Sequence, residues 1–231
     1  MLEGLTHLLF PEVCTLCRKP LDKGEEPICA GCFDDFNPFP GALAGGAALQ
    51  GTVRAHFGEQ ATPAAAWCLY PYRSIGSLHE AMHSMKYGGL FPLGELFGKR
   101  LGELVRQSAD HAPFDAIVPV PLHRLKRIER TYNQSEAIAN GMAGVLGVPV
   151  ATQCLERCLY TGSQTGLGLD ARRGNMAGAF RPARKACPPR VILVDDVLTT
   201  GATMVAAAEA LKTAGAVEVA FATVALTEKE A

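Results

Sequence analysis

The chain of 231 residues has no long apolar run and few aromatic side chains. No stretch approaches the roughly 20 apolar residues that a membrane-spanning helix needs. The segment 2–10 has neither a basic start nor a small-residue cleavage site. We therefore expect a cytoplasmic protein without membrane insertion. Only 7% of the residues are aromatic. The sequence therefore gives only a weak indication of a surface that binds nucleic-acid bases by ring stacking.

Two nucleotide-related patterns are also missing. The sequence contains no Gly-x4-Gly-Lys-Ser/Thr, which excludes a P-loop of the kind that powers motor proteins. It also shows no helix-turn-helix pattern, which argues against reading of duplex DNA. Any movement of a nucleic-acid strand would therefore have to be powered by another protein.

The net charge of −1 hides an uneven distribution of charge. Residues 1–60 contain eight acidic residues and four Lys or Arg, whereas residues 123–190 contain four acidic residues and eleven Lys or Arg. An anionic ligand is attracted to the side of a protein where cations gather. We expect the second region to bind an anion.

Four cysteines near the amino terminus form two Cys-x2-Cys pairs, Cys14 with Cys17 and Cys29 with Cys32. This spacing is typical of a tetrahedral structural zinc site, and an iron–sulfur cluster is the alternative. Disulfides are disfavoured without a secretion signal. Since about thirty residues cannot build much of a core, the metal would supply folding energy. We expect a zinc-ribbon-like module over residues 1–40 and a linker, rich in Gly and Ala, over residues 41–62.

Residues 63–231 show repeated strand–helix–strand patterns, which indicate an α/β domain with a mostly parallel sheet. The expected strands cover residues 67–72, 115–120, 148–152, 191–194 and 217–226. The expected helices cover residues 75–86, 92–107, 134–146 and 204–214.

The most informative segment runs from Val191 to Thr203. A short apolar strand leads into Asp195 and Asp196, and a turn of small and hydroxyl residues then opens a helix. Ligands of open α/β sheets bind beyond the carboxyl ends of the strands, and helix amino termini bind phosphate. The two carboxylates would bind ribose hydroxyls or Mg²⁺, and the turn would bind a phosphate through Thr199, Thr200, Gly201, Ala202 and Thr203. An acidic strand end before a capped helix is the alternative. The segment resembles the phosphoribosyl-pyrophosphate (PRPP) signature of type I phosphoribosyltransferases.

Three further elements carry candidate ligand contacts. Lys86 precedes two glycines that permit close approach to a ligand, although an ordinary exposed lysine is the alternative. The basic segment 124–130 is followed by Asn133 and Gln134, and together they could surround a diphosphate; a solvated basic helix start is the alternative. The glycine-rich segment 161–178 contains Gln164 and Arg172 and could form a lid.

Taken together, these motifs resemble the ComF family, of the ComFC and GntX type, over nearly the whole chain. The matching elements are the four cysteines after Leu-Leu-Phe-Pro11, Lys86-Tyr-Gly-Gly, Pro119-Val-Pro-Leu-His123, Tyr132-Asn-Gln134, Thr161-x2-Gln164, Arg172-x2-Asn175 and the PRPP signature. Two positions depart from the family: Thr131 stands where a glycine is usual, and Leu159 stands where a second basic residue is often found. The resemblance implies a zinc module joined to a type I phosphoribosyltransferase fold, with roles in natural competence and in the use of DNA.

Two functions follow as hypotheses. In the first, the protein binds PRPP with Mg²⁺ and transfers its phosphoribosyl group to an unknown acceptor, with Asp195, Asp196, Arg130 and Arg172 as the catalytic set. In the second, it is a non-catalytic protein that binds single-stranded DNA or senses PRPP, and a DNA-translocation helicase is a possible partner.

Overall fold

The computed structural model describes residues 13–22, 24, 26–108, 113–159, 178–183 and 185–228. Nearly all of the expected lid, with Gln164 and Arg172, lies outside these residues, and its role stays a prediction. Within the described part of the chain, no helix is long and apolar enough to cross a membrane.

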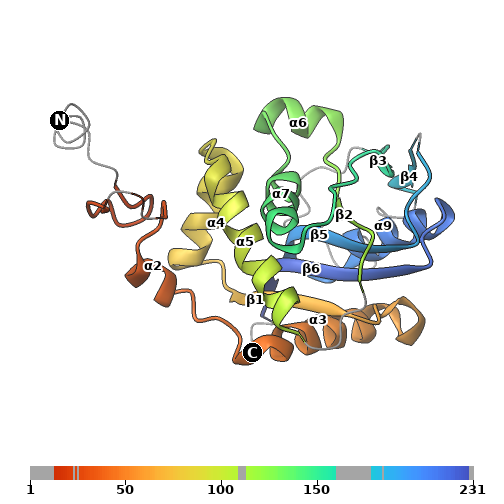
Figure 1. Ribbon diagram of the computed structural model, residues 1–231, viewed down its shortest axis with the longest axis horizontal. Helices are drawn as coiled ribbons and strands as arrows, with labels where there is room; N and C mark the ends of the chain where they lie inside the picture. The colour runs from red at the N-terminus through yellow and green to blue at the C-terminus, as the bar shows by residue number, and fades with distance from the viewer. Residues whose placement is uncertain are drawn as a thin grey trace.

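Four parallel strands form the central sheet, which confirms the predicted α/β class. Their order is β1 (Ala66–Tyr72), β6 (Glu218–Thr227), β5 (Arg190–Leu198) and β2 (Ala116–Pro119). The strand expected at 148–152 is reduced to one parallel bridge between Val150 and Ile117. Because the strands are parallel, their carboxyl ends lie at the same edge of the sheet. The chain continues from this edge into α4 after β1 and into α6 after β2 (Figure 1).

Helices cover both faces of the sheet. The sides of β5 alternate, because Ile192 and Val194 join one apolar core and Val191 and Leu193 join the other. The first core includes residues of α4 (Ser77–Tyr87), α5 (Phe91–Gln107) and α7 (Gln134–Leu146), and the second includes residues of α3 (Gly41–Phe57) and α9 (Ala202–Thr213). Such burial on both faces is what a continuous apolar strand requires.

The segment after residue 40, which we expected to be a linker, has regular secondary structure. Residues 41–57 form the helix α3, which packs on β1, and a short 3-10 helix follows at Glu59–Ala61. A Cβ on Gly46 would lie 2.0 Å from the carbonyl oxygen of Ala66. The small residues that suggested a loose connection are therefore the residues that let this helix approach the strand closely.

The four-cysteine module lies at one end of the molecule, beyond α4 (Figure 1). It includes the short helix α2 (Ala30–Asp34). The ring of Phe36 lies 5.4 Å from that of Tyr70 and 6.1 Å from that of Phe97, measured between centroids. The guanidinium of Arg100 lies over the ring of Phe33 at 3.8 Å. Aromatic and cation–π contacts thus connect the module to β1 and α5.

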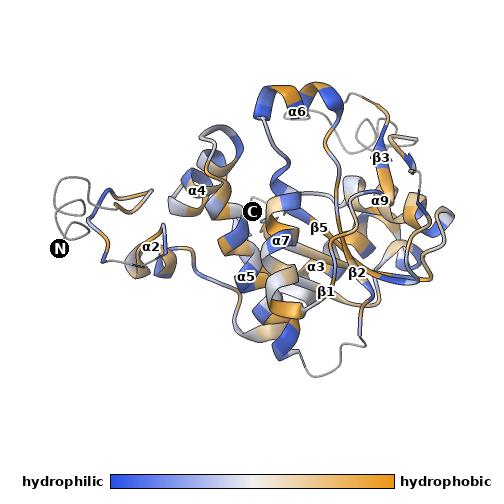
Figure 2. Cartoon of the chain, turned by 45° about the horizontal axis from the view of Figure 1, so that its top comes forward, coloured by the Kyte–Doolittle hydropathy of each residue, from blue (hydrophilic) through white to orange (hydrophobic). Residues whose placement is uncertain are grey.

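Two smaller elements complete the described chain. A two-stranded antiparallel sheet pairs β3 (Leu155–Arg157) with β4 (Phe180–Pro182). The helix α6 (Arg124–Arg130) projects from the body between β2 and α7 (Figure 2). Hydrophilic and hydrophobic residues alternate along α6, and Ile128 is 76% exposed.

Candidate functional site

The two adjacent carboxylates lie where one strand of the sheet stops before its neighbour does. We expected β5 to end at residue 194, but it continues to Leu198, and Asp195 pairs with Thr223 of β6. On the other side β2 ends at Pro119, and its last contact with β5 runs from the backbone N–H of Val120 to the carbonyl of Val194. Proline cannot donate a ladder hydrogen bond. The prolines that flank Val120 therefore end this pairing immediately before the acids.

Asp195 is held in place through one of its two carboxylate oxygens. The hydroxyl of Ser135 donates to Oδ1 at 2.8 Å, and the backbone N–H of Asp196 donates to the same oxygen at 2.9 Å. Among the described residues, no hydrogen bond reaches Oδ2 of Asp195. That oxygen could accept a hydrogen bond from a ligand or bind a metal ion.

Asp196 forms an ion pair with Lys86, which the sequence identified only as a possible ligand contact. The ammonium Nζ lies 3.0 Å from Oδ2 of Asp196, and the two side chains are only 23% and 14% exposed. The backbone N–H of Val197 donates to Oδ1 at 2.6 Å. The lysine comes from the last turn of α4, so the structure brings two distant motifs together.

The environment of Asp195 favours the protonated form of its carboxyl group. Burial and the neighbouring charge of Asp196 raise the pKa of Asp195 from 3.8 to about 7. The folded protein holds this proton at a pH where the unfolded chain has lost it. This group therefore destabilises the unliganded fold progressively as the pH rises from about 4 to about 7. Burial lowers the pKa of Lys86, but its attraction to Asp196 more than offsets this and leaves the pKa raised.

Further cations lie near Lys86. Burial, followed by the charges of Arg157 and Arg130, lowers the pKa of Lys126. The charge of Lys86 acts on Lys126 in the same direction. We call Lys86, Lys126, Arg130 and Arg157 the cation cluster. Mutual repulsion of this kind is relieved by an anion.

The junction between α6 and α7 fixes the predicted residues Asn133 and Gln134. The amide of Asn133 donates to the carbonyl of Val120 at 3.0 Å, and its Oδ1 accepts from the backbone N–H of Ser135 at 3.2 Å and so caps α7. Gln134 accepts from Arg130 at 3.2 Å. Both amides are buried. They tie the cation cluster and Ser135 to the end of β2.

Thr131, the residue that departs from the family pattern, ends α6 in the left-handed conformation with φ of 65°. A β-branched residue adopts this region only with strain, whereas glycine adopts it freely. This backbone conformation explains why glycine is the usual residue at this position.

We expect Thr131→Gly to stabilise the protein by about 1 kcal/mol, since relief of strain exceeds the added freedom of the unfolded chain. Urea unfolding measures the change. Gly144→Ala serves as a comparison, because a Cβ there meets nothing within 4 Å. A less stable Thr131→Gly variant would show that this conformation is not strained.

The predicted phosphate-binding turn leads into α9, as expected. Gly201 precedes the helix with φ of 91°, and a Cβ there would lie 3.0 Å from a methyl group of Val53. The hydroxyl of Thr200 accepts from the backbone N–H of Ala202 at 3.4 Å, while Thr199 is exposed and Thr203 is partly buried. The turn and the two aspartates belong to one continuous segment.

The four cysteines of the amino-terminal module lie together, and their sulfur atoms are all within 4.8 Å of one another. The sulfurs of Cys14 and Cys32 are 3.8 Å apart, and those of Cys17 and Cys29 are 3.7 Å apart. Burial favours the neutral thiol of Cys14, but backbone N–H groups, that of Cys29 first, lower its pKa to about 6. Four sulfurs that approach so closely, one of them biased to thiolate, could hold a zinc ion.

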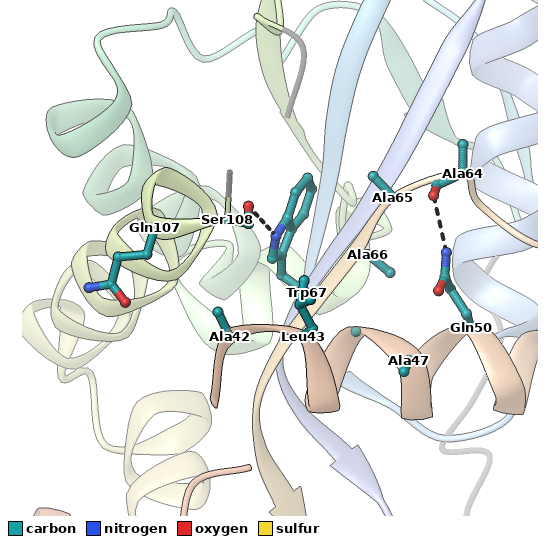
Figure 3. Close-up of a pocket in the computed structure, with 11 residues that line it drawn as sticks. Ala42, Leu43, Ala47, Gln50, Ala64, Ala65, Ala66, Trp67, Gln107 and Ser108 are labelled. Carbon is teal, nitrogen blue, oxygen red and sulfur yellow. Dashed lines mark hydrogen bonds between the residues drawn. The ribbon is translucent and has the colours of Figure 1, made fainter. Parts of the chain in front are cut away.

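A pocket of about 680 Å³ lies elsewhere, between α3, the start of β1 and the end of α5. Figure 3 shows its mainly apolar lining, in which Trp67 donates to Ser108 at 3.0 Å. Gln50 donates to the carbonyl of Ala64 at 3.2 Å. The lining residues carry no charged side chain, so this pocket is a poor place for a phosphorylated ligand.

The sequence alone assigned no role in the site to Ser135 or to Tyr132, although Tyr132 belongs to one of the matching motifs. Ser135 directly follows Asn133 and Gln134, but only the fold shows that its hydroxyl reaches Asp195 across sixty residues of sequence. Tyr132 donates from its hydroxyl to the carbonyl of Met85, and its ring lies 4.0 Å from that of Phe91. These two contacts of Tyr132 hold the end of α4, the helix that carries Lys86, in place.

The chain is similar to several known proteins. Residues 188–231, which contain both aspartates and the turn, match the phosphoribosyl transferase domain. Competence protein F of Haemophilus influenzae is 28% identical over 214 residues, which are 89% of this chain and 93% of that protein. The DNA utilization protein YhgH of Salmonella typhi is 27% identical over 225 residues, which are 92% and 96% of the two chains.

Among solved structures, the glutamine PRPP amidotransferase of B. subtilis is 25% identical, with a TM-score of 0.38. The match covers 56% of this chain and 25% of that one, so this chain spans about a quarter of that enzyme. The extended matches to the two curated relatives confirm the family resemblance that the motifs predicted. The chain is a homologue of competence protein F and of the DNA utilization proteins, with an α/β fold of the phosphoribosyltransferase kind and a four-cysteine cluster near its amino terminus.

Proposed function

We propose that this protein binds PRPP together with Mg²⁺ at the carboxyl edge of its sheet and acts in the cytoplasm, in DNA uptake or in the use of DNA. The observation that supports the proposal is the pair Asp195 and Asp196, in which Asp196 pairs with Lys86 of the cation cluster and which the turn before α9 follows in the same segment. A ligand that presents ribose hydroxyls, a phosphate and a diphosphate matches these three groups of residues. The names of the two relatives support the role with DNA.

Each part of the ligand has a candidate partner. Asp195 and Asp196 would accept hydrogen bonds from the 2- and 3-hydroxyls or bind Mg²⁺, a cation that prefers oxygen ligands. The backbone N–H groups and hydroxyls of residues 199–203 would bind the 5-phosphate. Lys86 and Arg130 would face the diphosphate, together with the predicted lid residues Gln164 and Arg172. Asn133 and Gln134 would position Arg130 and Ser135.

Phosphoribosyl transfer is the reaction that this arrangement would support. The bond from the anomeric carbon to the diphosphate oxygen breaks, and a bond from that carbon to the acceptor forms. Bound Mg²⁺ would supply neutralisation of the diphosphate charge. Arg130 and Lys86 would stabilise the leaving group as negative charge accumulates on it, and Asp195 would hold the ribose in place.

The cysteine cluster has a separate role in this proposal. Cys14, Cys17, Cys29 and Cys32 would hold a structural zinc ion, which replaces the core that so short a module lacks. Because the module contacts β1 and α5 rather than the aspartates, zinc would support the fold and take no part in transfer.

A calorimetric titration tests the ligand proposal. We expect one saturable site for PRPP with Mg²⁺, with at least roughly ten-fold weaker binding of ribose 5-phosphate or diphosphate alone, since each offers only part of the recognised groups. Omission of Mg²⁺ is expected to weaken the binding. A protein that binds diphosphate as tightly as PRPP would have a general anion site, and the proposal would then be wrong. Release of diphosphate in the presence of candidate acceptors separates transfer from binding alone.

A further inference from the structure

A row of aromatic rings runs along one side of α4. His79, His83 and Tyr87 are spaced by four residues, so they lie on one face of the helix. Tyr72, at the end of β1, donates to or accepts from Nδ1 of His79 at 2.8 Å. Successive ring centroids from Tyr72 to Tyr87 are 6.0, 6.4 and 4.9 Å apart. We call these four residues the ring row.

The exposed end of the ring row, His83 and Tyr87, lies outside the apolar core, whereas Tyr72 at the other end packs against that core and His79 is partly buried. The buried side of α4 consists of Leu78, Ala81, Met82 and Met85. His83 is exposed, and Tyr87 is 64% exposed. A large ring left in solvent at the end of a row of rings offers a face on which a planar group can stack.

Positive charge lies beside the exposed end of the row. The guanidinium of Arg130 lies 5.2 Å from the centroid of Tyr87 and donates to its hydroxyl at 3.4 Å. Lys86 is the adjacent residue of α4, and its charge and that of Arg130 both act on Lys126. The ring row and the cation cluster therefore meet at Tyr87.

We infer that the ring row stacks the bases of single-stranded DNA, while the cation cluster binds its phosphates. Proteins hold single strands by this combination of aromatic faces and cations. A row of several rings suits consecutive bases better than one base, and a duplex keeps its base faces covered. The low aromatic content of the chain is no obstacle, because the fold gathers four rings in one place. The inference does not depend on PRPP binding, although Lys86 and Arg130 would belong to both sites.

Fluorescence anisotropy with a labelled 20-residue oligothymidylate tests the inference. Removal of a stacking ring costs roughly five-fold or more in affinity per base, so we expect His83→Ala and Tyr87→Ala each to weaken binding by about that factor. Ile75→Ala is the matched control, because Ile75 is 80% exposed just before α4 but carries no ring. It should leave the affinity unchanged.

An abasic oligonucleotide of the same length separates stacking from charge. We expect it to bind wild type more weakly than oligothymidylate does and to be insensitive to His83→Ala. Equal binding of the two oligonucleotides, or full affinity in both ring variants, would overturn the inference. Displacement of the strand by free thymidine would indicate a single-base site and would overturn it as well.

Two measurements keep this test distinct from the test of the proposed function. Thermal unfolding of each variant confirms that the fold is intact. Calorimetry with PRPP and Mg²⁺ is expected to give the same affinity for His83→Ala as for wild type, because the contacts of His83 are with His79 and Tyr87 and not with the aspartates. Loss of DNA binding with PRPP binding retained supports the ring row alone.

Discussion

Replacement of Asp195 and Asp196 together by asparagine is expected to lower the affinity for PRPP with Mg²⁺ by at least about 100-fold. Each carboxylate would make charge-assisted hydrogen bonds or a metal contact, and two such interactions at roughly 1.5 kcal/mol or more each amount to this factor. An amide keeps the size of the side chain but loses its charge. Calorimetry of the variant beside wild type measures the difference.

The same double variant is expected to fold. Burial already favours the neutral form of Asp195, so an amide at that position is compatible with its surroundings. The loss of Asp196 as partner of Lys86 costs some stability, and the lysine side chain, at 23% exposed, retains partial access to water. Circular dichroism and thermal unfolding check this point.

Glu228→Gln is the matched control for the double variant. Glu228 follows β6 at the same edge of the sheet and pairs with Arg73 at 2.7 Å, and the two side chains are 43% and 74% exposed. Removal of this charge should leave PRPP affinity unchanged. An unchanged affinity in the aspartate variant would mean that PRPP is bound elsewhere or not at all.

Cys32→Ser is expected to abolish stoichiometric metal binding and to unfold the amino-terminal module. Cys32 is a buried member of the cysteine cluster, and structural zinc supplies binding energy on the order of 10 kcal/mol to such modules. Three remaining thiolates close a tetrahedral site poorly. The measured zinc content is expected to fall from one ion per chain to none. Limited proteolysis is expected to cleave the chain within residues 13–40.

The rest of the protein is expected to survive this change, with a lower melting temperature. Loss of the module would uncover Tyr70 and Phe97, which pack against Phe36, and so would remove part of the apolar core. Cys158→Ser is the control, because Cys158 lies outside the cluster. Retention of full metal content by Cys32→Ser would contradict the assignment of the cysteine cluster as the metal site. Iron and visible absorbance in the wild-type protein would show that the cluster holds an iron–sulfur centre instead of zinc.

The sequence was most informative where local patterns and the final fold agree. The helix predicted at residues 134–146 has these bounds in the structure, because Asn133 caps its start and Gly147 ends it in the left-handed conformation. The apolar run before Asp195 indicated a buried strand, and both faces of β5 are covered. Capping and burial are properties that a short window of sequence encodes directly.

The sequence was least informative where tertiary contacts decide. Residues 41–57 read as a linker because glycine and alanine carry little pattern, yet the close approach of α3 to β1 requires them. The contact from Ser135 to Asp195 and the ion pair from Lys86 to Asp196 join distant segments. Local propensity says nothing about which segments meet, so the site could be predicted in its parts but not in its pairings.

The protons exchanged during PRPP binding give the most direct test of the central claim. At pH 7 part of the Asp195 population is protonated, because its pKa is about 7. Ribose hydroxyls and Mg²⁺ favour the ionised carboxylate, so binding should expel that proton. Titrations of wild type and Asp195→Asn with PRPP and Mg²⁺, in two buffers of different ionisation enthalpy, measure the proton count.

We expect wild type to release more protons than Asp195→Asn at pH 7, and this difference should disappear at pH 9, where Asp195 is already ionised. The difference between the two proteins removes the contribution of the protons carried by PRPP itself. Equal proton counts for both proteins at pH 7, or no PRPP binding by wild type, would contradict the placement of the ligand on these two aspartates.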